Sequence, residues 1–320
     1  MATAERYAVT ALTLTPATGA APGEDPMPAS TTVSITDAQV LQAAAEIGVL
    51  GAGQGMIPLI MARLCDPEST AHDVAQVIGQ EPGLAARVLR VANSAYYGAS
   101  GTVATLERAF VLLGVDAVRG IAAAACLNRA TVRAIQSSPI GLESMQRHAV
   151  AVACAAESLA RVSHRSLAAE AFIAGLLHDF GVTLQLHVDR ARLLEVIGAL
   201  RADPQRNPRE VERSLGCIGH ERCAAVVFRA WNLPENLVAA IGSHHEPGAA
   251  PPGSRRLAAL VHLADRISLT TGHGYALEPE AGPLEEGTLA ILGIQESFLS
   301  HVAEALPERV RELQRVLSES

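Results

Sequence analysis

The 320-residue chain contains no lysine, so all 25 of its basic residues are arginines. The absence of lysine excludes a Schiff-base lysine, a phosphate-binding P-loop lysine and a kinase-type lysine. The net charge is −8, and no basic run occurs to neutralise phosphates, which argues against general nucleic-acid binding. We expect the one arginine-rich stretch to be an ordinary solvated face: Arg201, Arg206, Arg209 and Arg213.

Aromatic residues are also scarce, at 3% of the chain, although 49% of its residues are hydrophobic. Alanine, leucine, valine and isoleucine must therefore fill the core, and abundant alanine favours closely packed helices. The five cysteines lack C-x-x-C spacing, which indicates small buried side chains in a reduced, cytoplasmic setting. No apolar run reaches the roughly 18 residues of a membrane span, and the N-terminus is a poor secretory signal, so no membrane association is expected.

The residue pattern predicts an all-α chain in three parts. Residues 1–36 are rich in Thr, Ala, Pro and Gly without periodicity, which predicts a flexible lead-in. Residues 37–138 alternate short apolar-periodic segments with Gly and Pro turns and predict an N-terminal helical subdomain. Residues 139–320 predict a second helical domain, a bundle, after a boundary at Ser137–Pro139. No segment has the convincing alternation of a strand.

Turn and cap residues place the expected helices. Thr70, with Asp73 three residues later, has the spacing of a capping box, and Gly181 is expected to stop the apolar helix that carries His178. A helix over 117–128 offers only Arg119 as a base and is expected to be buried, not to read DNA. The expected ranges are 38–50, 57–64, 70–80, 84–93, 105–113, 117–128, 142–162, 167–178, 191–200, 210–215, 220–231, 235–244, 256–269, 285–292 and 296–317.

Imidazoles and carboxylates form an ordered set in the second domain. Neutral ring nitrogens and carboxylate oxygens supply the lone pairs that a divalent transition metal needs. The spacings are too long for one helix or loop, so several antiparallel helices would each contribute to a shared site in the bundle core. The set comprises seven residues: His148, His178, Asp179, His220, His244, His245 and Asp265.

Two pairs in this set are adjacent in sequence, His178 with Asp179 and His244 with His245. Adjacent residues on a regular helix point roughly 100° apart. We expect both pairs at helix ends, where two neighbours can reach one site or flank two sub-sites. The remaining histidines are interpreted as ordinary core or surface groups, with a role behind the ligands left open for His262: His72, His164, His187, His262, His273 and His301.

The order of these residues resembles the HD superfamily of metal-dependent phosphohydrolases. The additional His220, His244 and His245 resemble the members that hold a second metal ion. We therefore expect at least one divalent transition-metal ion and favour two, and the mixed nitrogen and oxygen ligands are compatible with iron, manganese or zinc. The core set that the resemblance implies would be the following: His148, His178, Asp179 and Asp265.

The upstream segments are similar to the HDOD domain of bacterial signalling proteins. Matching stretches occur at Glu81–Leu84 and at Leu89–Gly98, whose Asn93–Gly98 part is the most specific. The resemblance runs from about residue 45 to 270 and implies an all-helical, HD-like fold. It departs from the HD-GYP kind, because Gly181 and Val182 stand near where that group has a lysine, and Glu246–Ala249 replaces its Gly-Tyr-Pro motif.

Two functional hypotheses remain. The first is a cytoplasmic bacterial signalling protein of the HDOD type whose metal-loaded site acts by binding a signalling partner or a nucleotide ligand. The alternative is a metal-dependent phosphohydrolase or phosphodiesterase acting on a nucleotide phosphate ester, with Asp179 as the catalytic residue between two ions. An arginine would then have to replace the missing lysine: Arg147, Arg222 or Arg266. The N-terminal subdomain, whose one histidine is His72, is expected to dock or bind partners without contributing a catalytic group.

Overall fold

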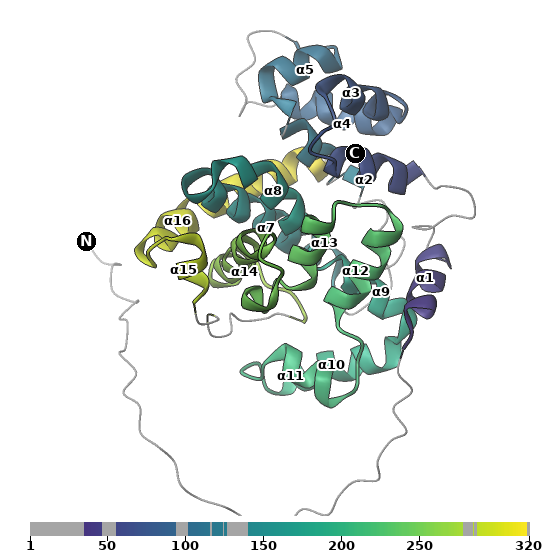
Figure 1. Ribbon diagram of the computed structural model, residues 1–320, viewed down its shortest axis with the longest axis vertical. Helices are drawn as coiled ribbons and strands as arrows, with labels where there is room; N and C mark the ends of the chain where they lie inside the picture. Colours follow the sequence, from purple (N-terminus) through teal and green to yellow (C-terminus); the bar gives the residue numbers. More distant parts are fainter. Residues whose placement is uncertain are drawn as a thin grey trace, which may run out of the picture. The chain divides into compact units, whose positions relative to one another are not determined.

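The computed structural model describes residues 35–46, 56–93, 102–115, 117–123, 125–126, 140–277, 284 and 287–318. These residues form helices joined by turns, and the described ranges contain no strand (Figure 1). The all-α prediction is therefore confirmed. Residues Ser34–Ser320 form one compact unit, and the division of the helices at residue 138 stays a prediction. Most of the predicted lead-in and the stretch after Asn93 lie outside the described residues.

The N-terminal helices begin and end close to the expected positions. The capping box is confirmed, since the Thr70 hydroxyl accepts from the Asp73 amide at 3.2 Å and the Asp73 carboxylate accepts from the Thr70 amide at 2.9 Å. Pro82 is the first residue of its helix, where its missing N–H costs nothing. The elements are α1 (Asp37–Glu46), α2 (Met56–Cys65), α3 (Ala71–Gly79), α4 (Pro82–Ala92) and α5 (Leu106–Leu113).

Asn93 ends α4 and connects it to the segment before α5. Its side-chain amide donates to the carbonyls of Leu89 at 2.7 Å and Val103 at 2.8 Å, and its side-chain oxygen accepts from the Val103 amide at 2.8 Å. Residues 117–123 and 125–126 are also helical. Arg119 there is buried and donates to the carbonyl of Ser69, as the sequence predicted for a helix that packs inward.

The second set of helices is organised around α7, against which α8, α14 and α16 pack. A Cβ built on Gly175 of α8 would lie 2.9 Å from the backbone of α7, so the two helices approach as closely as glycine and alanine permit. The helices are α7 (Leu142–Ser163), α8 (Ala168–Leu177), α9 (Phe180–Val188), α10 (Arg190–Ala202), α11 (Pro208–Ser214), α12 (His220–Ala230), α13 (Glu235–Gly242), α14 (Arg255–Thr270), α15 (Thr288–Leu292) and α16 (Ser297–Ser318), with 3-10 turns at Arg165–Leu167 and Pro247–Ala249.

The expectation that Gly181 stops a helix was wrong. The chain breaks at His178 and Asp179, and Gly181 lies inside the next helix, α9, which the sequence analysis missed. A Cβ at Gly181 would overlap the carbonyl oxygen of His220 at the start of α12. The glycine is therefore needed for close contact between α9 and α12, and not for a turn.

The stretch Arg165–Val188 is long and apolar enough, by length and composition, to cross a membrane, whereas no run of this length was expected from the sequence. Within its apolar window 78% of the residues are buried in the fold, which is typical of a core helix. It also consists of α8 and α9 with the break at His178 between them. The cysteines are all free, and four of the five are buried as expected, with Cys217 partly exposed.

Candidate metal centre

The fold brings the seven side chains of the predicted set to one place. Asp265 lies on α14 and His148 on α7, and the other residues lie at helix ends. His178 and Asp179 occupy the break between α8 and α9. His220 is the first residue of α12, and the pair His244 and His245 follows the end of α13.

A first group surrounds one oxygen of Asp179. The Nε2 atom of His148 lies 3.2 Å from Nε2 of His178 and 3.3 Å from Oδ1 of Asp265. Oδ2 of Asp179 lies 3.5 Å from Nε2 of His148 and 3.3 Å from Nε2 of His178. We call His148, His178, Asp265 and this Asp179 oxygen the first group.

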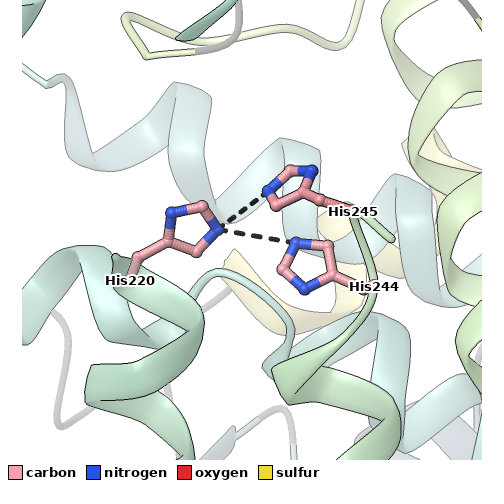
Figure 2. Close-up of side chains that lie close together, drawn as sticks. All are labelled: His220, His244 and His245. Carbon is pink, nitrogen blue, oxygen red and sulfur yellow. Dashed lines mark hydrogen bonds between the residues drawn. The ribbon is translucent and has the colours of Figure 1, made fainter. Parts of the chain in front are cut away.

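A second group surrounds the other oxygen of Asp179. Nε2 of His220 lies 3.1 Å from Nε2 of His245 and 3.5 Å from Nε2 of His244, and Figure 2 shows these three rings turned toward one another. Oδ1 of Asp179 lies 3.2 Å from Nε2 of His220 and 3.9 Å from Nε2 of His244. These three histidines and this oxygen form the second group. Asp179 therefore presents one carboxylate oxygen to each group.

Hydrogen bonds to the backbone define which nitrogen of three rings carries the proton. A carbonyl oxygen only accepts, so each of these Nδ1 atoms is the donor, and Nε2 is the nitrogen that faces the centre of the cluster. The three bonds run from His148 to the His273 carbonyl at 3.0 Å, from His178 to Gly175 at 2.7 Å and from His244 to Ile241 at 2.6 Å.

Charge is distributed unevenly over the cluster. Burial disfavours the charged form of His148, but the carboxylates of Asp179 and Asp265 outweigh it and raise the pKa of His148 well above its usual value. Burial, together with the neighbouring imidazoles, lowers the pKa values of His244 and His245 well below the usual value. The surrounding histidines hold the pKa of Asp179 well below its usual range despite burial. The two carboxylates thus attract positive charge into the site.

Two buried carboxylate oxygens indicate that the cluster suits a metal ion. Oδ1 of Asp179 and Oδ1 of Asp265 are buried and accept no hydrogen bond, an arrangement that is costly unless a cation compensates it. The facing groups are imidazole Nε2 atoms, which supply a lone pair to a metal ion from the neutral ring. Nitrogen and oxygen donors in this mixture match the preferences of iron, manganese and zinc. The residues present therefore fit the divalent ion that the sequence predicts.

Several side chains that support the cluster were missed in the sequence. The Tyr275 hydroxyl donates to Oδ2 of Asp179 at 2.7 Å, and its ring centroid lies 5.1 Å from that of His148. The Ser268 hydroxyl, one turn after Asp265, lies 3.3 Å from Nδ1 of His148. Tyr275 follows α14 in a turn, with no periodic spacing to indicate its role. The supporting role left open for His262 agrees with the fold, because its Nδ1 lies 2.9 Å from the carbonyl of His244.

The expectation of a solvated arginine face was wrong for Arg209. Its guanidinium pairs with the carboxylates of Glu212 and Glu221, both of which are buried beside His220. Burial disfavours the charged form of Glu212, but His220 and Arg209 outweigh it and lower the pKa of Glu212 to about 2. The other three arginines of that stretch are exposed, as expected: Arg201, Arg206 and Arg213.

Comparison with known proteins gives consistent matches. The HDOD domain profile matches residues 54–247. An uncharacterized protein of Treponema pallidum (strain Nichols) is 23% identical over 201 residues, which are 62% of this chain but only 38% of that protein. The fold is similar to the crystal structure of a candidate signal transduction protein from Marinobacter aquaeolei VT8, with a TM-score of 0.68 and 22% identity over 90% of this chain and 68% of that one. It is also similar to the crystal structure of a candidate phosphohydrolase from Shewanella amazonensis SB2B, with a TM-score of 0.64 and 24% identity over 88% of this chain and 98% of that one. At these identities the likeness establishes a shared fold.

Proposed function

This chain belongs to the HDOD domain family, and we propose that it is a cytoplasmic bacterial signal-transduction protein built around a two-metal centre. Its output would be the binding of a signalling protein partner or a nucleotide ligand. The observation that carries the proposal is the position of Asp179, whose two oxygens face separate groups of imidazoles. A carboxylate placed in this way suits the bridging ligand of two ions.

Each group would hold one ion. The first ion would be held by His148, His178, Asp265 and Oδ2 of Asp179, and the second by His220, His244, His245 and Oδ1 of Asp179. The Oδ1 atoms of the two aspartates support this assignment, because they are buried, accept no hydrogen bond and face imidazoles that could share a cation with them.

The surroundings of the ligands favour a binding or regulatory role over rapid turnover, because few cations are placed to replace the missing lysine. Six of the seven side chains are buried, and His245 is the partly exposed one. Two of the arginines considered as replacements for the missing lysine already have carboxylate partners near the surface. Arg222 pairs with Asp37 at 2.8 Å, and Arg147 pairs with Glu143 at 3.5 Å.

Metal content tests this proposal directly. Protein purified without chelators should contain about two equivalents of transition metal per chain by elemental analysis, as expected for a two-metal site. Less than about half an equivalent would contradict the proposal. Isothermal titration of the metal-replete protein with nucleotides and cyclic dinucleotides would then separate a nucleotide ligand from a protein partner.

A metal-dependent phosphohydrolase is the second candidate, and Arg266 is the residue that favours it. Arg266 follows Asp265 on α14 and is half-buried. Burial lowers its pKa, and the charge of Asp265 opposes that change. A partly desolvated guanidinium can stabilise developing charge on a phosphate ester. When bound, two divalent ions would stabilise the attacking and leaving oxygens of an in-line displacement.

An activity assay distinguishes the two candidates. Metal-replete protein would be incubated with cyclic dinucleotides and nucleotide monoesters, beside Asp179→Ala, Arg266→Ala and the exposed control Arg165→Ala. We expect slow or absent turnover of cyclic dinucleotides, because loss of one electrostatic stabiliser costs about 10²–10³ in rate. Brisk turnover that disappears in the Asp179 and Arg266 variants and persists in the control would establish the enzyme instead.

A further inference from the structure

A polar cluster lies behind His220, on the side of the ring away from the second group. We propose that Glu212 and Glu221, bridged by Arg209, are positioning residues that hold His220 and thereby set the metal affinity of the second group. The inference rests on the proposed two-metal centre and deepens it, because it assigns to one of the two ions a supporting network of its own.

The surroundings of Nδ1 distinguish His220 from His148, His178 and His244. Nδ1 of His220 lies 3.7 Å from Oε1 of Glu212 and 3.8 Å from Oε2 of Glu221, and all three side chains are buried. The Nδ1 atoms of three other histidines of the cluster instead donate to neutral backbone carbonyls. Both carboxylates lie just beyond hydrogen-bond distance of Nδ1, and their negative charge behind the ring favours this orientation and makes Nε2 a stronger donor to a metal.

The two carboxylates are themselves held in place. Oε1 of Glu212 accepts from the Gln185 amide at 2.8 Å, and the same amide donates to the Ile218 carbonyl at 2.6 Å. Arg209 pairs with Glu212 through one terminal nitrogen and with Glu221 through the other. The network therefore joins α9, α11 and the start of α12, and the carboxylates cannot turn away from His220 without breaking several contacts.

Glycine at position 219 makes room for this network. A Cβ on Gly219 would lie 2.6 Å from Oε2 of Glu221 and 3.2 Å from both terminal nitrogens of Arg209. With Gly181, which permits the close approach of α9 to the His220 backbone, two glycines thus allow the contacts that position this one ligand.

A third metal ion is the rival explanation, because Glu212, His220 and Glu221 have ligand atoms close enough together to hold one. Arg209 argues against it, since its guanidinium already supplies the positive charge between the two carboxylates. One arginine leaves a single negative charge uncompensated, and Oε2 of Glu221 accepts no hydrogen bond. His220 is the remaining group that faces both carboxylates, with Nδ1 at 3.7 Å from Glu212 and 3.8 Å from Glu221.

The test compares retention of the two ions in isosteric variants. Glu212→Gln, Glu221→Gln and the double variant remove charge while keeping shape, and Glu210→Gln, exposed on the same helix, is the matched control. Each protein would be loaded with Zn²⁺, dialysed against a graded series of chelator concentrations and measured by elemental analysis. The double variant should lose one ion at about 10–100-fold lower chelator strength than wild type, while the other ion and the control are unchanged.

Two further measurements separate positioning from general destabilisation. The visible spectrum of the fully Co²⁺-loaded double variant should differ from that of wild type, because the ligands of the weakened ion are oriented differently. A loss of stability alone would not change the spectrum of fully loaded protein. Thermal unfolding of the chelator-treated proteins checks that the variants fold. If the double variant does not fold, the two single variants replace it in the comparison.

The outcomes separate the proposals. If the double variant holds two ions as tightly as wild type does, the positioning role is overturned and the two-metal centre is not. Three ions in wild type and two in the double variant would establish the rival site, and fewer than half an equivalent in wild type would overturn both proposals.

Discussion

The helices α2–α5 and the helices α7–α14 share one alanine- and leucine-rich composition but bury different kinds of side chain. Within the described part of residues 56–126, the buried polar residues are Ser69 and Arg119, which contact each other. The later helices bury a cluster of imidazoles and carboxylates around Asp179. Apolar packing can stabilise the first region by itself, whereas the second must compensate charge that is withdrawn from water.

The largest effect is expected from Asp179→Ala, which removes an oxygen from both groups at once. Both ions should be lost, and the free energy of unfolding should fall by about 3–5 kcal/mol, as when one partner of a buried charged set is removed. Elemental analysis and urea unfolding measure the two effects, with the exposed Asp203→Ala as control. Two retained ions would contradict the bridging role.

Gly181→Ala should be the next most severe change, because its Cβ would overlap the carbonyl of His220. Separating α9 from α12 should lower the free energy of unfolding by about 1–3 kcal/mol. It should also lower the metal affinity of the second group more than that of the first group. Gly198→Ala on α10 is the matched control, since its Cβ would meet nothing within 4 Å. Equal behaviour of the two variants in thermal unfolding would show that the close contact is unimportant.

Tyr275→Phe removes one hydrogen bond to Asp179 and leaves the ring in place. We expect metal affinity to fall about 10-fold, the lower range for losing a group that orients a ligand, with little change in the unfolding of the chelator-treated protein. Competition with a chelating indicator measures the affinity. An unchanged affinity would mean that Asp179 is oriented by the histidines alone.

In the N-terminal region, Thr70→Ala tests a local interaction. Loss of the hydroxyl cap should cost about 1 kcal/mol and leave metal content unchanged. Hydrogen bonds from Thr70 lower the pKa of Asp73. Their contribution to the free energy of unfolding is therefore present above the ordinary pKa of aspartate and is lost as the pH falls through the lowered pKa. The difference between variant and wild type should therefore shrink in acid. A difference in thermal unfolding that stays constant from neutral to low pH would contradict this coupling.

The smallest effect is expected from His72→Ala. His72 is exposed on α3, so the variant should retain the metal content and stability of wild type. Loss of metal in this variant would show that the N-terminal helices contribute to the centre, and would remove the contrast between the two regions.

Short-range patterns in the sequence were sufficient for much of the fold. The capping box of Thr70 and Asp73 involves residues three apart, and the ends of α8 and α13 follow from helical periodicity, so both are visible locally. Glycine was ambiguous, because the same residue ends helices and permits close helix contacts. Gly181 serves the second purpose, and only the position of α12 reveals it.

In the candidate site, too, some features are visible in the sequence and others depend on the tertiary structure. Residue type and order alone selected the seven side chains of the cluster, because two adjacent pairs at helix ends are hard to explain as core packing. The tertiary structure decided which oxygen of Asp179 faces which histidines, and it brought Tyr275 and Arg209 to the cluster. These contacts join residues on separate helices, and their distances depend on helix packing that no local pattern records.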